Sequence, residues 1–123
     1  MPLVEKARIE VYIPDAPKIA YWQFLRDLDR EFTYVFGGAT TIRGLEGSYL
    51  SGHGLYLADQ VSLIYTDTPF PFEKYFDALS DYGDSLRDSA MARLEEEAIL
   101  VTVQKIFHSV SEKKPPPTLT LIS

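Results

Sequence analysis

Apolar and polar residues alternate with a period of two near the start of the chain. The stretch RIEVYI, residues 8–13, has apolar side chains at every second position from Ile9 to Ile13. This alternation is typical of a strand with one buried face. Three further strands are predicted at residues 39–50, 55–67 and 98–107. The last of them is an apolar run rich in β-branched residues, which favour strands.

Two longer segments have the spacing of amphipathic helices. In Lys18–Val35 the core-facing stripe consists of Tyr21, Leu25, Leu28 and Phe32. The pair Gly37-Gly38 follows, and glycine readily supplies the left-handed conformation that ends a helix. A second helix is predicted from about residue 70 to residue 94, with Gly83 as a candidate position for a kink or a break.

The predicted order of elements is therefore β-α-β-β-α-β, which is the ferredoxin-like arrangement of the α+β class. Right-handed crossovers place both helices on one face of a four-stranded antiparallel sheet. A length of 123 residues suits one domain. We predict a single ferredoxin-like domain over residues 1–108 and a proline-containing C-terminal tail over residues 109–123.

The tail, which ends in SEKKPPPTLTLIS at residues 111–123, allows two interpretations. Its charged, triple-proline start favours an extended or disordered segment. Its end, TLTLIS, alternates apolar and polar residues and could instead add a strand to the sheet edge of a partner.

One face of such a sheet is left uncovered by helices. In the last strand, Ile99, Val101 and Val103 are predicted to face the core. The opposite side of that strand carries Leu100, Thr102, Gln104 and Ile106, and Tyr12 and Ile64 are expected to join it. Because large exposed apolar surfaces mark interfaces, we predict self-association through this face, as a homodimer.

Composition and charge narrow the function classes. The chain contains no cysteine, which rules out disulfides, thiolate metal sites and cysteine nucleophiles. A net charge of −6 without a basic cluster disfavours nucleic-acid binding. No apolar run is long enough for a membrane span, and the first 13 residues lack the apolar region of a signal peptide. We therefore predict a cytoplasmic protein without nucleic-acid or membrane partners.

Six of the seven glycines fall within residues 36–54, FGGATTIRGLEGSYLSGHG. No glycine there is followed by lysine, as a phosphate-binding P-loop requires. The stretch GHGLYL lacks the third glycine of a dinucleotide fingerprint and leads into a strand. The predicted roles of these glycines are a helix end, a bulged strand and a hairpin turn.

The hairpin turn makes a specific prediction about two carboxylates. A loop centred between Gly52 and His53 pairs Glu46 with Asp59, and like charges directly opposite each other are unfavourable. Either a bulge at Gly44 or Gly47 separates them, or a cation or shared proton joins them. The candidate binding residues are Arg43, Glu46, Tyr49, His53 and Asp59. We predict no metal site and no cofactor, and no catalytic residue can be assigned.

The stretch FGGATTIRGLEGSYLSGHGLYLADQVSLIYTD resembles a family of small bacterial domains of unknown function. The family pattern is F-G-G-x-T, then G-x-W or G-x-Y, a glycine turn, and an acidic residue before an apolar strand. The matching elements are Phe36–Thr40, Gly47–Tyr49, Gly52 or Gly54, and Asp59. The resemblance covers residues 8–107, and it supports the fold without implying an activity.

Two functions remain open at this point. The first is a homodimeric module that binds a small ligand or a protein, which the bare sheet face and the missing catalytic set favour. The second is a cofactor-free enzyme with a cleft between the sheet and the helices. The second hypothesis rests on analogy of fold, and fold alone does not determine function.

Overall fold

Six elements follow one another in the predicted order in a computed structural model that describes residues 3–50 and 56–109. They are β1 (Leu3–Pro14), α1 (Ile19–Phe36), β2 (Thr40–Leu50), β3 (Tyr56–Asp67), α2 (Phe72–Leu94) and β4 (Leu100–Ser109). The predicted β-α-β-β-α-β order is thereby confirmed. Apart from Ser109, the predicted tail lies outside the described residues.

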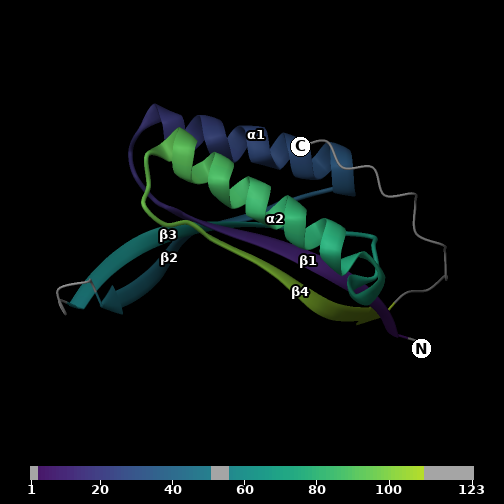
Figure 1. The fold of residues 1–123 in the computed structure, drawn as a ribbon. Helices are drawn as coiled ribbons and strands as arrows, with labels where there is room; N and C mark the ends of the chain where they lie inside the picture. The colour runs from purple at the N-terminus through teal and green to yellow at the C-terminus, as the bar shows by residue number, and fades with distance from the viewer. Residues whose placement is uncertain (1–2, 51–55, 110–123) are drawn as a thin grey trace.

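The four strands form one antiparallel sheet in the order β2-β3-β1-β4. Both helices cover the same face of this sheet, and the β2–β3 hairpin projects beyond their ends (Figure 1). The ferredoxin-like fold class is confirmed. Neither α1 nor α2 is long and apolar enough to cross a membrane.

The end of α1 matches the expectation from the double glycine. Gly37 has φ 100°, in the left-handed region, and its N–H donates to the carbonyl oxygen of Thr33 at 3.0 Å. This is the usual way in which glycine ends a helix. The chain then turns directly into β2, so that the FGGAT segment lies where α1, β2 and the end of β3 meet.

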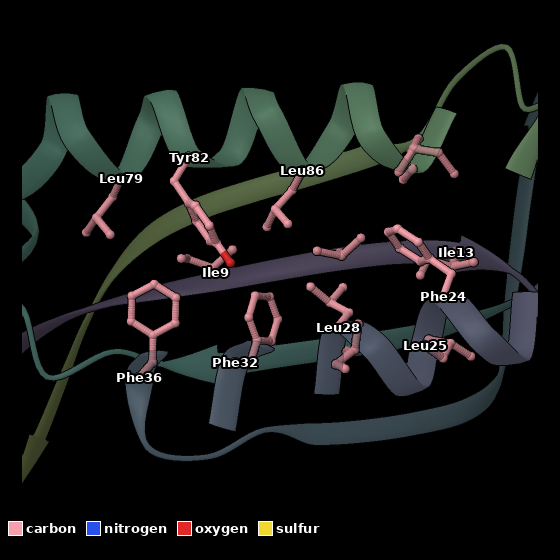
Figure 2. Packing of buried hydrophobic residues seen from close by; sticks show 14 of the residues in the cluster. Ile9, Ile13, Phe24, Leu25, Leu28, Phe32, Phe36, Leu79, Tyr82 and Leu86 are labelled. Carbon is pink, nitrogen blue, oxygen red and sulfur yellow. The ribbon is translucent and has the colours of Figure 1, made fainter. Parts of the chain in front are cut away.

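The core lies between the sheet and the two helices (Figure 2). The predicted α1 stripe is buried, together with Phe24 and Phe36. Aromatic rings gather at one end of the core: Phe36 makes edge-to-face contacts with Phe32, Phe70 and Tyr82, at centroid distances of 5.6 to 6.2 Å. Such contacts add to the stabilisation from apolar burial alone.

Gly83 does not break α2, which is continuous from Phe72 to Leu94. Its role is close packing against β4. A Cβ atom at this position would lie 3.3 Å from Cγ2 of Val103 and 3.6 Å from Cγ1 of Val101. The glycine therefore allows α2 to approach β4 closely, and it does not kink the helix.

We expect Gly83→Val to lower the free energy of unfolding by about 1–3 kcal/mol, because added methyl groups in a filled core force side chains or backbone to move. Urea denaturation followed by circular dichroism measures the change. Ser85→Val on the exposed side of the same helix is the control, since it adds a β-branched residue without overpacking. Equal effects of the two variants would contradict the packing role of Gly83.

Candidate functional site on the open sheet face

The sheet face without helices is defined by the strand register, and we call it the open face. On β1, Ala7, Ile9, Val11 and Ile13 are fully buried under the helices, so the residues between them point the other way. The cross-strand partners extend this assignment to the other strands. The residues of the open face are Val4, Lys6, Arg8, Glu10, Tyr12, Thr40, Ile42, Leu45, Val61, Leu63, Tyr65, Asp67, Leu100, Thr102, Gln104, Ile106 and His108.

The faces of β3 are opposite to the prediction for Ile64. This residue pairs with Val11 and is fully buried beneath the helices, whereas Leu63 and Tyr65 lie on the open face. Ser62 and Thr66, two positions away on the same side of β3, are buried with it. The hydroxyl of Thr66 donates to the carbonyl oxygen of Gly38 at 2.7 Å, which offsets the cost of burying it. The outward positions predicted for Tyr12 and for β4 agree with the register.

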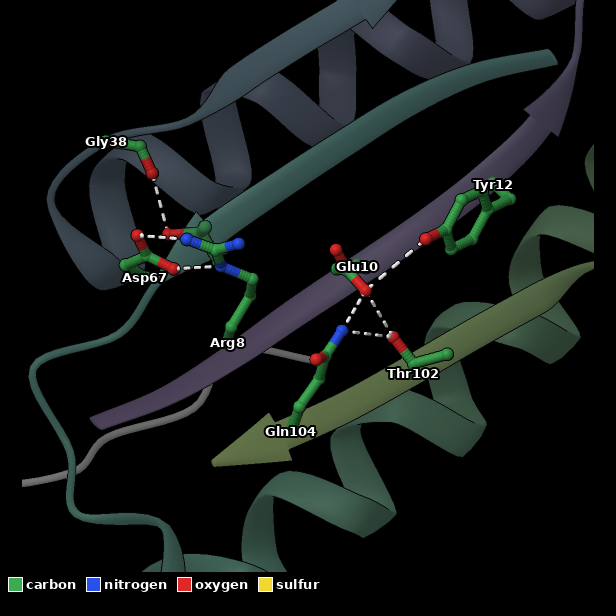
Figure 3. Close-up of polar contacts among 8 residues, drawn as sticks. Arg8, Glu10, Tyr12, Gly38, Asp67, Thr102 and Gln104 are labelled. Carbon is green, nitrogen blue, oxygen red and sulfur yellow. Dashed lines mark hydrogen bonds and ion pairs between the residues drawn. The ribbon is translucent and has the colours of Figure 1, made fainter. Parts of the chain in front are cut away.

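A carboxylate lies at the centre of the open face. Glu10 is only 8% exposed, although no helix covers it. Its Oε1 accepts hydrogen bonds from the Tyr12 hydroxyl at 3.4 Å and the Thr102 hydroxyl at 2.9 Å. It also accepts one from the side-chain amide of Gln104 (Figure 3). Burial and the neighbouring Glu10 charge together raise the pKa of Tyr12, so this hydroxyl stays protonated and remains a donor.

An ion pair continues this polar surface toward β3. The guanidinium of Arg8 contacts both carboxylate oxygens of Asp67, with its Nε 2.6 Å and its Nη2 3.1 Å away (Figure 3). The same guanidinium lies 4.5 Å from the centre of the Tyr65 ring. The hydrogen bond to Asp67 raises the pKa of Arg8, with smaller contributions from nearby charges.

Together these residues form a belt of polar side chains across three adjacent strands. We call it the polar belt; it consists of Asp67, Arg8, Glu10, Tyr12, Thr102 and Gln104. A carboxylate held in this way is fixed in position, because one oxygen is saturated with donors. Its other oxygen can accept a hydrogen bond from a bound molecule or from another chain.

A hollow of about 350 Å³ lies next to Asp67, at the edge of the belt. It is lined by Phe36, Gly37, Gly38, Ala39, Thr40, Tyr65, Thr66 and Asp67. The FGGAT segment thus forms one wall, and the end of β3 forms the other. A second hollow, of about 380 Å³, is lined only by residues from the first turns of α2. The first hollow is the better candidate for a ligand, because it joins elements that are far apart in sequence.

The predicted pairing of Glu46 with Asp59 is wrong. Glu46 pairs with Gln60, and Asp59 pairs with Gly47, so the two acidic residues are not partners in the ladder. The cause is the turn: Leu50 pairs with Tyr56, which leaves an odd number of residues between the strands instead of the even number expected. No cation or shared proton is needed to explain the sequence.

The predicted bulge is present at Gly44. Arg43 and Gly44 together oppose Ser62, and Gly44 has φ 73°, which is the conformation of a bulge with glycine in the left-handed region. Arg43 is exposed and forms no ion pair with the described residues. The bulge adds one residue to β2 and so offsets the one-residue difference at the turn. Beyond the bulge, Ile42 pairs with Leu63, which is also its partner in the predicted hairpin.

The remaining predicted site residues can be placed only in part. Tyr49 lies in β2 and pairs with Leu57, while His53 lies outside the described residues. Of the five candidates, only Arg43 and Glu46 have described side chains, so the proposed binding set stays a prediction. Within residues 3–50 and 56–109, no group of three or more histidine, aspartate or glutamate side chains could hold a metal ion. Core residues from the sheet and both helices pack in the layer between them.

The fold of this chain is similar to that of solved proteins. CPII, a nitrogen regulatory PII-like protein from Thiomonas intermedia, matches with a TM-score of 0.51 and 17% identity. The match covers 89% of this chain and all of CPII, in a structure bound to ADP, AMP and bicarbonate. The fold is similar to that of a PII-like protein. At this identity the likeness concerns the fold alone.

Two further matches have lower TM-scores. A second CPII structure, bound to ADP, AMP and acetate, has a TM-score of 0.49, 18% identity and coverage of 89% of this chain and 94% of that one. The divalent cation tolerance protein Cut A1 from Thermus thermophilus has a TM-score of 0.44, 14% identity and coverage of 90% and 88%. No protein-family model and no curated protein matches the sequence. The resemblance to bacterial domains of unknown function therefore stays a hypothesis.

The sequence alone does not show the polar belt. Alternation along β1 predicts the face on which Glu10 lies, but it does not show which residues lie beside it in the next strand. The available signal was the surplus of polar donors on one side of the last strand, at Thr102 and Gln104. Such donors opposite an acidic residue in a paired strand indicate a hydrogen-bonded carboxylate.

Proposed function

We propose that the chain is a self-associating module that binds a small ligand, with the open face as the surface between copies. The observation that supports this best is the apolar surface around the polar belt. Leu100 is 58% exposed and Ile42 is 42% exposed, while Leu45, Val61 and Tyr65 are partly exposed. These side chains lie on a face that the chain's own helices do not cover, where a second copy would remove them from water.

Charge also favours a second copy as the occupant of the open face. The chain carries a net charge of −6, so two copies repel each other over most surfaces. On β1, β4 and residues 61–67 of β3, the open face carries two basic residues, Lys6 and Arg8, and two acidic ones, Glu10 and Asp67. This part of the face is therefore neutral, which lets like chains approach.

The small-ligand part of the proposal is supported by the PII-like fold and by the hollow beside Asp67. CPII was solved with ADP, AMP and bicarbonate, and these molecules are the first probes to test. The hollow has a polar lining with backbone groups of residues 37–39 at its wall. Ligand sites typically place a few polar groups in a concave surface in this manner.

We expect the wild-type chain to self-associate at micromolar concentration and Leu100→Lys to weaken that association by at least about tenfold. A desolvated charge in place of an apolar contact is the physical reason. Ile19→Lys is the matched control, because Ile19 is a similarly exposed aliphatic residue on α1. Sedimentation velocity measures both. A monomeric wild-type chain, or equal loss in both variants, would contradict the proposed surface.

We expect at least one of ADP, AMP and bicarbonate to raise the thermal midpoint of the wild-type chain, since a ligand that binds only the native state stabilises it. Ala39→Arg, which fills the hollow, should reduce the shift, and Ala20→Arg on the exposed side of α1 should leave it unchanged. Differential scanning fluorimetry measures the shift. A shift that persists in Ala39→Arg would place the ligand elsewhere.

A further inference from the structure

One basic residue of the open face has no partner within the described structure. Lys6 lies on β1 with its side chain directed to the open face, opposite Ile106 of β4. It forms no ion pair or hydrogen bond with the described residues. Arg8, two positions along, is fully engaged with Asp67. Of the two basic residues that β1 places on the open face, Lys6 is therefore the one without a described partner.

One carboxylate oxygen on the same face also lacks a partner. All three hydrogen bonds to Glu10 end on Oε1, from Tyr12, Thr102 and Gln104. No described residue donates to Oε2, which carries no dashed line in Figure 3. This oxygen is not among the fully buried atoms without a partner, so water can reach it in a single chain. If a second copy covers the open face, the water is displaced and a new donor is required.

The strand geometry keeps these two groups apart within one chain. Lys6 and Glu10 are four residues apart on the same side of β1, so their Cα atoms lie about 13 Å apart. No contact between the described side chains of Lys6 and Glu10 spans this distance, so each copy carries an unused donor and an unused acceptor. Complementary groups of this kind can pair between copies, either twice across a two-fold axis or successively around a closed ring.

We propose that Lys6 of one copy donates to Oε2 of Glu10 in a neighbouring copy. This inference rests on the proposed self-association through the open face and deepens it, because it assigns the polar contact that aligns the copies. The surrounding apolar residues bring the faces together without fixing their relative position. A charged pair at the belt would fix it, because any other alignment leaves a carboxylate oxygen and an ammonium group without partners.

A double-mutant cycle tests this contact. The variants are Lys6→Gln, Glu10→Gln and the two combined, with the dissociation constant of the assembly measured by sedimentation equilibrium. Glutamine at position 10 keeps an oxygen for the three existing donors, so the fold is expected to persist, and thermal melts verify this. Lys18→Gln, at an exposed position preceding α1, is the control for loss of one positive charge.

We expect each single variant to weaken association by about tenfold or more. The dissociation constant of the double variant should rise by much less than the product of the two single increases, because both substitutions remove the same contact. Strictly multiplicative effects, or a Lys6→Gln variant that behaves like Lys18→Gln, would overturn the pairing while leaving self-association intact. A wild-type chain that is monomeric would instead overturn the proposed function, and the pairing with it.

Discussion

Replacing Phe36 with alanine is expected to lower the free energy of unfolding by about 3–5 kcal/mol, the range for deleting a buried aromatic side chain. Phe36 is the last residue of α1 and is 6% exposed. Its ring contacts three other rings, from Phe32, Phe70 and Tyr82. The cavity left by alanine could not close easily, because its walls come from α1, the segment before α2, and α2, which are held by their own contacts.

The same helix provides a control for this change. Tyr34, two residues earlier, is 87% exposed, so Tyr34→Ala should change stability by less than about 0.5 kcal/mol. Urea denaturation of both variants gives the comparison. Phe36 also lines the hollow beside Asp67, so its loss should weaken any ligand bound there. Similar stability losses in the two variants would show that the aromatic cluster contributes little.

Raising the pH above about 10 is expected to destabilise the fold through Tyr82, by about 1.4 kcal/mol for each pH unit. The Tyr82 hydroxyl donates to the Glu31 carboxylate, which links α2 to α1. Burial of Tyr82 is the main cause of its raised pKa, and the hydrogen bond and charge of Glu31 add to it. The pKa in the folded chain lies well above the value of 10.0 for a free tyrosine.

The direction of the effect follows from proton binding. Above about pH 10, Tyr82 loses its proton in the unfolded chain but keeps it in the folded chain. The unfolded state then binds fewer protons, so stability is complete below this pH and falls as the pH rises. Tyr82→Phe should remove this slope, while lowering stability at neutral pH by about 0.5–1.5 kcal/mol through the lost hydrogen bond.

Urea midpoints measured between about pH 8 and pH 12 test this expectation. The pKa of Tyr12 is also raised, but Tyr12 is present in both wild type and variant, so its contribution cancels in the comparison. Tyr34→Phe, at an exposed position, is the control for removal of a tyrosine. An alkaline decline that is equally steep in wild type and Tyr82→Phe would contradict the assignment to Tyr82.

The elements of the fold could be predicted closely because their signals are local. The stripe from Tyr21 to Phe32 placed α1, and the glycine at position 37 set its end. The β-branched run before Phe107 placed β4. Residues 3–7 were not predicted as strand, although β1 begins at Leu3. That part of β1 is ordered by pairing with β4, which a local pattern does not show.

The candidate site depended on information that a single strand does not carry. Ile64 was assigned to the wrong face because its neighbours are polar, but Thr66 has a buried acceptor in the distant Gly38. The acidic pair was misaligned because a change of one residue in a turn alters every partner that follows. The polar belt joins residues from β1, β3 and β4, so it exists only once the strand order is known.

The bulge at Gly44 also determines how the hairpin tolerates a change of length. Ile42 and Leu45 share the open face although three positions separate them. Deleting Gly44 would leave both residues opposite their present partners, Leu63 and Val61. Deleting a residue outside the bulge, such as Thr41, would turn part of β2 over. The deletion would change chiefly the bend and twist of the strand. An insertion or deletion at position 44 could therefore redirect the projecting β2–β3 hairpin and leave the strand pairing in the rest of the sheet unchanged.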